Sequence, residues 1–208
     1  MSLLSRLAVI AALSIAACSP GEPAASAPTV QSGPDSGRRE VALFAGGCFW
    51  SVEANLEAMS GVVSAVSGFA GGTVTNPSYD QVVRGGTGHL EAVQVTYDPA
   101  RISYRQLVDR FWRTIDPTDP DGQFCDQGAP YATAVFATAA QRPVAEASRA
   151  AAVAVIGERR FVTPVRNAAR FWPAESYHQD FARLNPVRYG GYSRFCGREA
   201  RLRAVWGS

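Results

Sequence analysis

The sequence contains no lysine. All 20 of its basic residues are arginines, and 18 acidic residues leave a net charge of only +2. This near-neutral balance gives no support for a nucleic acid or another polyanion as the partner. Because the chain is also rich in alanine, we attribute the choice of arginine over lysine to genome composition. Apolar residues make up 47% of the chain, which is enough to bury a sizeable core.

Residues that bind metals are also scarce. The four cysteines are Cys18, Cys48, Cys125 and Cys196. They form no C-x-x-C pair, which argues against a zinc ribbon and against a thioredoxin-type active site. The only histidines are His89 and His178, and two ligands make a weak metal site. We therefore expect neither a metal nor another bound cofactor.

The N-terminal apolar run, residues 7–17, is too short to span a bilayer. It follows Arg6 and is typical of an export signal, so we expect residues 1–17 to be a signal peptide. Small residues precede Cys18, as in a bacterial lipobox, where the cysteine becomes lipidated; an ordinary signal peptide cleaved near Ala17 is the alternative. Residues 18–38 are rich in Ser, Pro and Gly, which indicates a tether. We expect a periplasmic protein of the cell envelope that contacts a membrane only through this lipid anchor.

The remaining residues, 39–208, are predicted to form one domain. Strands are expected at residues 40–47, 61–72, 89–99 and 131–138, and helices at 49–61, 103–115 and 139–157. A short strand near residues 160–165 and a short helix at 173–186 are weaker signals. This alternation predicts an α/β (α+β) fold, with a single two-layer domain, a mixed central sheet flanked by helices, and a long irregular C-terminal tail.

The segment "AGGCFW", residues 45–50, places Cys48 at a predicted strand-to-helix turn. A helix N-terminus favours the thiolate form of a cysteine through its free N–H groups and its dipole. Gly46 and Gly47 allow a sharp turn and the close approach of a substrate. We therefore interpret Cys48 as a reactive thiol with a lowered pKa; a buried structural cysteine is the alternative. If Cys18 carries a lipid, three cysteines remain, and an odd number also indicates a reactive thiol.

Several motifs occur together in a familiar order. They are "GGCFWSVE", "NPSYDQV", "GTGHLEAVQVTYDP", "FWRTIDPTDPDGQFCDQGAPY" and "ESYHQDFARLNP". In this arrangement the chain resembles the A-type peptide methionine sulfoxide reductases from about Glu40 to its end. The resemblance implies reduction of the S-epimer of methionine sulfoxide, in peptides and as the free amino acid.

The resemblance also implies roles for individual residues. Cys48 is the nucleophile that attacks the sulfoxide sulfur, and Glu91 donates a proton to the departing oxygen. The apolar neighbours of Glu91 should bury it and keep it protonated. The other implied site residues are Tyr79 and Tyr131, which hold the sulfoxide oxygen, Asp126, which supports the site, and Phe49 and Trp50, which line a pocket for the substrate methyl group.

Recycling requires a second thiol, because the attack leaves a sulfenic acid on Cys48. The family often has a cysteine where this chain has Gly190, and Cys196 lies six residues later. Gly190 and Gly191 would allow the tail to swing inward. We expect Cys196 to be a recycling cysteine. Cys125, which adjoins Asp126, competes with it as the first resolving cysteine, and a relay from Cys48 through Cys125 to Cys196 is a further alternative, so the order of exchange stays open. A thioredoxin-like protein would supply the electrons.

Two other functions remain open from the sequence. A cysteine peptidase or amidase would use Cys48 with His89 or His178 as its base. A non-enzymatic surface lipoprotein would bind a partner through its aromatic tail and would show no thiol reactivity at Cys48. The prediction that we carry forward is a monomeric reductase that acts on oxidised proteins or peptides.

Overall fold

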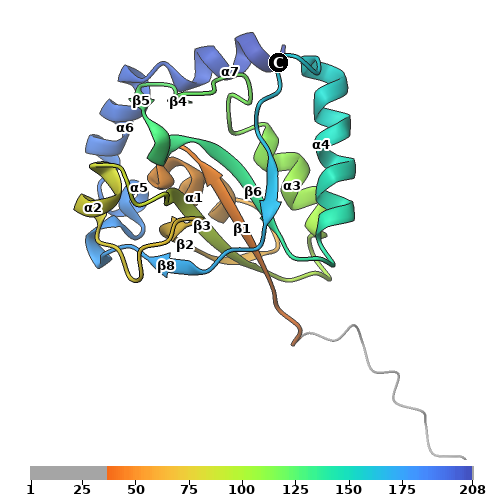
Figure 1. The fold of residues 1–208 in the computed structure, drawn as a ribbon, viewed down its shortest axis with the longest axis horizontal. Coiled ribbons are helices and arrows are strands. Elements are labelled where there is room, and N and C mark those ends of the chain that lie inside the picture. Colours follow the sequence, from red (N-terminus) through yellow and green to blue (C-terminus); the bar gives the residue numbers. More distant parts are fainter. Residues whose placement is uncertain (1–36, 208) are drawn as a thin grey trace, which may run out of the picture. The chain divides into compact units, whose positions relative to one another are not determined.

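A computed structural model describes residues 37–207 of the chain (Figure 1). The predicted signal peptide and the predicted lipidation site, Cys18, lie outside the described residues. Within this range, none of the helices has the length and apolar character needed to cross a membrane.

The centre of the domain is a six-stranded mixed sheet in the order β7-β6-β1-β3-β2-β8. Its strands are β1 (Glu40–Gly46), β2 (Val62–Ala70), β3 (Leu90–Tyr97), β6 (Thr133–Ala137), β7 (Val165–Asn167) and β8 (Phe171–Pro173). All neighbouring pairs are antiparallel except β6 and β7. The predicted fold class and the four main predicted strands are confirmed.

The two faces of the sheet bury different clusters, as strand alternation requires. In β1, Ala42 and Phe44 belong to the main core, whereas Leu43 and Ala45 belong to a smaller cluster on the other face. The main core is completed by α1 (Phe49–Glu57), α3 (Tyr104–Trp112) and α4 (Arg142–Ile156). These helices all pack into one cluster, which confirms the two-layer arrangement of sheet and helices.

Local sequence signals explain where two of the helices begin. α3 starts after Ser103, whose side chain accepts a hydrogen bond from the Gln106 N–H while the Gln106 side chain bonds back to Ser103. The short helix α2 (Tyr79–Val83) starts in the same way after Ser78. Such capping boxes satisfy N–H groups that have no partner within the helix. The second capping box matters for the site, because it places Tyr79 in the first turn of α2.

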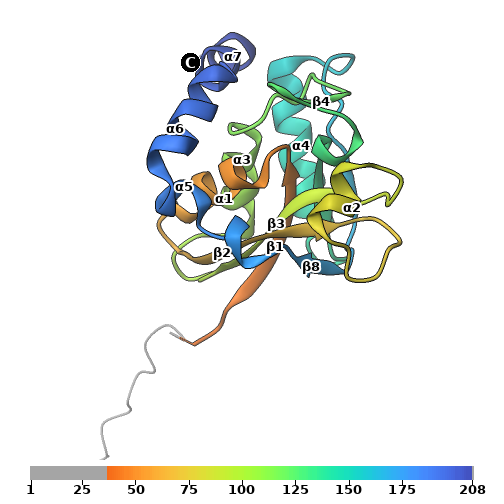
Figure 2. The same cartoon turned by 90° about the vertical axis from the view of Figure 1, so that its left-hand side faces the viewer.

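The expected irregular C-terminal tail is instead helical. It consists of α6 (Pro186–Phe195) and α7 (Arg198–Trp206), which follow one another along one side of the domain (Figure 2). Gly190 and Gly191 lie within α6, so they are helical residues and not the hinge that we expected. Proline at the first position of α6 is favourable there, and Gly197, in the left-handed region, separates the two helices. Because glycine is a poor helix former, the adjacent Gly190 and Gly191 kept us from recognising α6 in the sequence.

Two weaker predictions are shifted in the structure. The short strand expected at residues 160–165 begins at Val165 and forms β7. The helix expected at residues 173–186 is divided into a 3₁₀ turn (Ser176–His178) and α5 (Phe181–Leu184). Asp180 separates them with a φ of 55°, a left-handed conformation that a continuous helix excludes.

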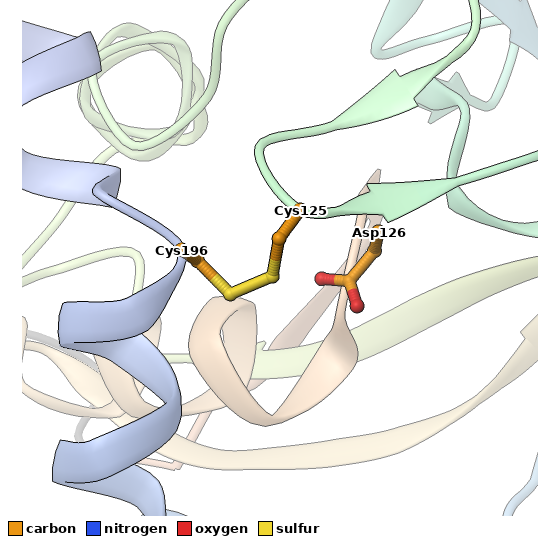
Figure 3. A group of neighbouring side chains, drawn as sticks. All are labelled: Cys125, Asp126 and Cys196. Atoms are coloured by element: carbon orange, nitrogen blue, oxygen red, sulfur yellow. A yellow bond between two sulfur atoms is a disulfide. The ribbon is translucent and has the colours of Figure 1, made fainter.

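A small hairpin that we did not predict lies beside the C-terminal helices. It is formed by β4 (Gly122–Gln123) and β5 (Asp126–Gln127). Cys125 in its turn forms a disulfide with Cys196 at the end of α6 (Figure 3). The bond links residues 71 positions apart, so it fastens the helical tail to the hairpin.

Candidate active site

Cys48 occupies the N-cap position of α1, shortly after the end of β1, as the strand-to-helix pattern predicted. Gly47 makes the turn with a φ of +76°, a conformation that favours glycine. A Cβ atom at Gly47 would overlap the Cβ and Cγ of Gln123. Gln123 is fully buried, and its amide hydrogen-bonds to the backbone of Asp116 and Gly122. The glycine therefore allows the hairpin to pack directly against the cysteine turn.

The substitution Gly47→Ala tests this packing. We expect it to lower the free energy of unfolding by about 2–4 kcal/mol, because a left-handed residue gains a Cβ and a dense contact becomes overpacked. Urea denaturation measures the change. Gly85→Ala is the matched control, since Gly85 also has a positive φ but a Cβ atom added there would have nothing within 4 Å. Equal losses in the two variants would show that the contact with Gln123 is unimportant.

Glu91 lies in β3 and is only 2% exposed. Its Oε2 accepts a hydrogen bond of 2.9 Å from the backbone N–H of Phe49, the residue after Cys48. Burial raises the pKa of Glu91 to about 8, and the Phe49 N–H opposes this rise only in part. The carboxyl group is therefore protonated at neutral pH, as we predicted.

The Cys48 thiol is 6% exposed, and its pKa is raised to about 12. Burial is the main cause, and the nearby carboxyl of Glu91 adds to it. The prediction of a lowered pKa is therefore wrong: the helix N-terminus does not offset the loss of solvent and the nearby acidic groups. At rest, Cys48 is a protonated thiol, and it must lose its proton during the reaction.

Two tyrosines face the carboxyl group of Glu91. Tyr79 opens α2, and its backbone N–H donates to Glu175 Oε1 at 3.0 Å. Tyr131 comes from the short 3₁₀ turn after the hairpin (Ala129–Tyr131). Each phenol interacts with Glu91 and with the other phenol, and burial raises both pKa values. Both hydroxyl groups thus remain protonated and can act as hydrogen-bond donors beside the acid.

Phe49 and Trp50 form an aromatic wall next to Cys48. Phe49 is buried against Phe69 and the ring of His178. Trp50 stacks on Phe181 with ring centres 3.7 Å apart, and its indole N–H donates to His178 Nδ1 at 3.1 Å. The wall is therefore held in place by groups from the segment that follows β8. We did not predict that Phe181 stacks on Trp50, because the sequence around a single aromatic residue does not indicate which residue it will contact.

Asp126 lies in β5, and its carboxylate accepts a hydrogen bond from the hydroxyl of Tyr192 in α6. The Tyr192 hydroxyl also contacts the Cys48 thiol. Burial raises the pKa of Asp126, while Tyr192 and Arg198 act in the opposite direction. We did not identify Tyr192 from the sequence, because the helix that directs it toward the site was not recognised.

The predicted cysteines divide into a free thiol and a disulfide. Cys48 is free and buried, whereas Cys125 and Cys196 are bonded to each other. Cys125 is exposed and adjoins Asp126 of the site, as we expected for a resolving cysteine. The structure thus brings all the described candidate residues into one region.

Both histidines form hydrogen bonds with groups other than Cys48. His89 accepts from the Gly72 N–H at 3.2 Å and contacts the Val74 carbonyl at 2.8 Å. The Nδ1 of His178 accepts from Trp50. Within residues 37–207, neither imidazole is hydrogen-bonded to the Cys48 thiol, so the geometry does not support a cysteine peptidase.

A protonated thiol beside a protonated carboxyl group suits attack on an electrophile that must take up a proton as it reacts. The disulfide in the same region and its reduced form, a pair of thiols, differ by two electrons, so this cysteine pair can take up and release an electron pair. The fold and the site therefore define a thiol-dependent oxidoreductase.

The comparison with known proteins agrees with this class. The family model described as peptide methionine sulfoxide reductase matches residues 40–208. Peptide methionine sulfoxide reductase MsrA 2 of Caulobacter vibrioides is 44% identical over 204 residues, which cover 98% of this chain and 100% of that protein. The protein of the same name from Rhizobium meliloti is 49% identical over 169 residues, covering 81% and 84% of the two chains.

Solved structures show the same relationship. Methionine sulfoxide reductase A of Corynebacterium diphtheriae superimposes with a TM-score of 0.64 at 30% identity, covering 74% of this chain and 78% of that one. The reduced form of Mxr1 from Saccharomyces cerevisiae gives a TM-score of 0.67 at 29% identity, with coverages of 74% and 89%. The chain belongs to the peptide methionine sulfoxide reductase family and is an oxidoreductase that reduces methionine sulfoxide.

Proposed function

We propose that the protein reduces the S-epimer of methionine sulfoxide, in oxidised proteins and as the free amino acid, with Cys48 as nucleophile and Glu91 as acid. The observation that carries this assignment is the protonated carboxyl of Glu91, bonded to the first N–H of the helix that Cys48 caps. A sulfoxide oxygen is a poor leaving group until it is protonated, so a carboxylic acid that is still protonated at neutral pH suits the reaction.

The methyl sulfoxide group of the substrate has a polar end and an apolar end, and the site has a polar and an apolar side to match them. The sulfoxide oxygen would accept hydrogen bonds from the phenols of Tyr79 and Tyr131, next to Glu91. The methyl group would lie against Phe49 and Trp50, which carry no charge. A small group that is polar at one end and apolar at the other fits this division.

The reaction balances without a bound cofactor. The Cys48 sulfur attacks the sulfoxide sulfur while Glu91 gives its proton to the oxygen. The thiol proton then restores the acid, methionine leaves reduced by two electrons, and Cys48 holds the oxygen as a sulfenic acid. Since the pKa of the resting thiol is high, its proton must leave as the sulfoxide oxygen takes one up.

The oxidised Cys48 is then returned to a thiol by two further cysteines. Cys125 condenses with the sulfenic acid and releases water, and Cys196 attacks Cys125 and displaces Cys48. The resulting Cys125–Cys196 bond is the disulfide in the structure. A thioredoxin-like dithiol protein would reduce it at the surface, where Cys125 is exposed and Phe195 next to Cys196 is 86% exposed.

Two serine variants test this order. Cys125→Ser and Cys196→Ser should each form about one equivalent of methionine and then turn over more than about 100-fold more slowly with a thioredoxin-like reductant. Cys196→Ser should accumulate a Cys48–Cys125 disulfide, and Cys125→Ser a sulfenic acid on Cys48. Peptide mapping of the quenched proteins distinguishes these species. Full turnover by Cys125→Ser would exclude Cys125 as the first resolving cysteine.

We further propose that the protein works in the bacterial cell envelope. The support is the N-terminal sequence, with its apolar run, the small residues before Cys18 and the tether after it. Lipidation of Cys18 would anchor the protein while the tether lets the domain reach oxidised proteins. In this compartment the reductant would be an envelope protein of the thioredoxin type.

A further inference from the structure

Two groups, the Tyr192 hydroxyl and the Asp126 carboxylate, link the thiol of Cys48 to the disulfide. The Tyr192 hydroxyl donates to the Asp126 carboxylate and also contacts the Cys48 thiol. The Asp126 carboxylate lies within 4.8 Å of both sulfur atoms of the Cys125–Cys196 pair. Figure 3 shows the Asp126 side chain projecting from the hairpin on the same side as the disulfide. One carboxylate therefore lies close to the bonded sulfurs and is connected through one phenol to the free sulfur.

The position of Tyr192 depends on the same helix as the disulfide. Tyr192 lies within α6, and Cys196 follows four residues later at the C-cap of this helix. The two side chains therefore lie on adjacent turns of one helix face. Asp126 and Cys125 are neighbours in the hairpin. When Cys196 reaches Cys125, Tyr192 is therefore brought to Asp126 and Cys48 at the same time.

We infer that Asp126 and Tyr192 form a proton relay for the thiol–disulfide exchange that frees Cys48. This inference rests on the proposed function, since it concerns the second exchange of the proposed relay. Asp126 acts as the base for Cys196, and Tyr192 delivers a proton to Cys48.

Each atom in this step is accounted for. Asp126 takes the proton of the Cys196 thiol, and the thiolate attacks Cys125. The Cys125–Cys196 bond forms, and the Cys48–Cys125 bond breaks with its electron pair on Cys48. Tyr192 gives its proton to the Cys48 sulfur and takes one from Asp126. One proton has moved from Cys196 to Cys48, and no external oxidant or reductant is needed.

The surroundings suit such a transfer. The carboxylate of Asp126 has a raised pKa, chiefly through burial, which makes it a better proton acceptor for a thiol than an exposed carboxylate. Cys48 also holds its proton firmly, because burial and Glu91 raise its pKa, and so a departing thiolate there needs a donor. The other titratable groups that act on the relay are Glu91 and Arg198. The buried guanidinium of Arg198 favours the ionised form of Asp126.

The test is a time course on the full chain. Reduced protein is mixed with one equivalent of methionine S-sulfoxide without a reductant, quenched with acid at intervals, alkylated and mapped by mass spectrometry. In Tyr192→Phe we expect the Cys48–Cys125 disulfide that forms after the first methionine to persist, and its exchange with Cys196, timed from the formation of that disulfide, to slow about 100-fold. Asp126→Asn, which cannot take a proton, should show the same slowing. The exchange in Asp126→Asn should accelerate as pH rises, because Cys196 can then ionise without Asp126.

Tyr104→Phe is the matched control for loss of a phenol. The Tyr104 hydroxyl is buried in α3 and has no hydrogen-bond partner among the described residues, so the variant should fold and react as the wild type does. Exchange in Tyr192→Phe at the wild-type rate would overturn the inference. Loss of the first methionine in that variant alone would also overturn it, because Tyr192 would then act in sulfoxide reduction. Failure of the proposed function differs: the wild type itself would form no disulfide that contains Cys48.

Discussion

Replacing Cys48 with serine should lower the rate of methionine formation by about 10⁴-fold or more. A serine hydroxyl loses its proton far less readily than a thiol, and its oxygen cannot take up oxygen from a sulfoxide. The substitution only replaces the sulfur atom with a smaller oxygen atom. It lies at a buried N-cap position, where serine is itself a favoured residue. The fold should therefore survive, and the loss should be chemical.

The measurement is methionine released from methionine S-sulfoxide with a chemical dithiol as reductant. Cys18→Ser is the matched control and should keep the wild-type rate in solution, because Cys18 has no part in the proposed chemistry. Substantial methionine formation by Cys48→Ser would move the reaction to another group.

Glu91→Gln should lower kcat by about 10²–10⁴-fold, the usual contribution of a general acid. Glutamine keeps the size of the side chain and an oxygen that can accept the Phe49 N–H, but it has no acidic proton. The KM for the sulfoxide should change much less than kcat, since Tyr79 and Tyr131 still face the oxygen. Glu199→Gln makes the same substitution on the exposed face of α7, away from the site, and should have no effect.

The pH dependence gives a second test of Glu91. Its pKa is raised from 4.5 to about 8, so the acid is present below pH 8 and is lost above it. The wild-type rate of methionine formation should fall as pH rises through about 8, and the residual rate of Glu91→Gln should not show that fall. The folded state also binds this proton more tightly than the unfolded chain does. The resulting stabilisation is complete below the unfolded pKa of 4.5 and decreases as pH rises to about 8.

Local patterns were sufficient for the parts of the molecule in which neighbours in sequence decide the structure. The alternation in β3 predicted a strand. The burial and protonation of Glu91 were predicted only with the family resemblance, since a strand glutamate taken alone is more often exposed. The glycines before Cys48 predicted the turn, and the structure shows why one of them is needed. That Tyr79 and Tyr131 belong to the same site as Cys48 and Glu91 was predicted only from the family motifs, because hydrophobic periodicity does not indicate contacts between distant residues.

The remaining features depend on contacts between distant segments. The pKa of Cys48 results from burial beneath other elements and from the nearby Glu91, and the helix terminus alone pointed in the wrong direction. Tyr192 reaches Asp126 because a disulfide fastens α6 to the hairpin, and two glycines had concealed that helix. Burial and long-range packing outweigh local preferences in both cases.

The most direct test of the account is mass spectrometry of the full wild-type chain after one turnover with methionine S-sulfoxide and no reductant. We predict about one equivalent of methionine per protein, a free thiol at Cys48 and a disulfide between Cys125 and Cys196, with Cys48–Cys125 as the earlier species. If no methionine forms and all three cysteines remain thiols, or if methionine forms while Cys48 never enters a sulfenic acid or a disulfide, then the role assigned to Cys48 is wrong.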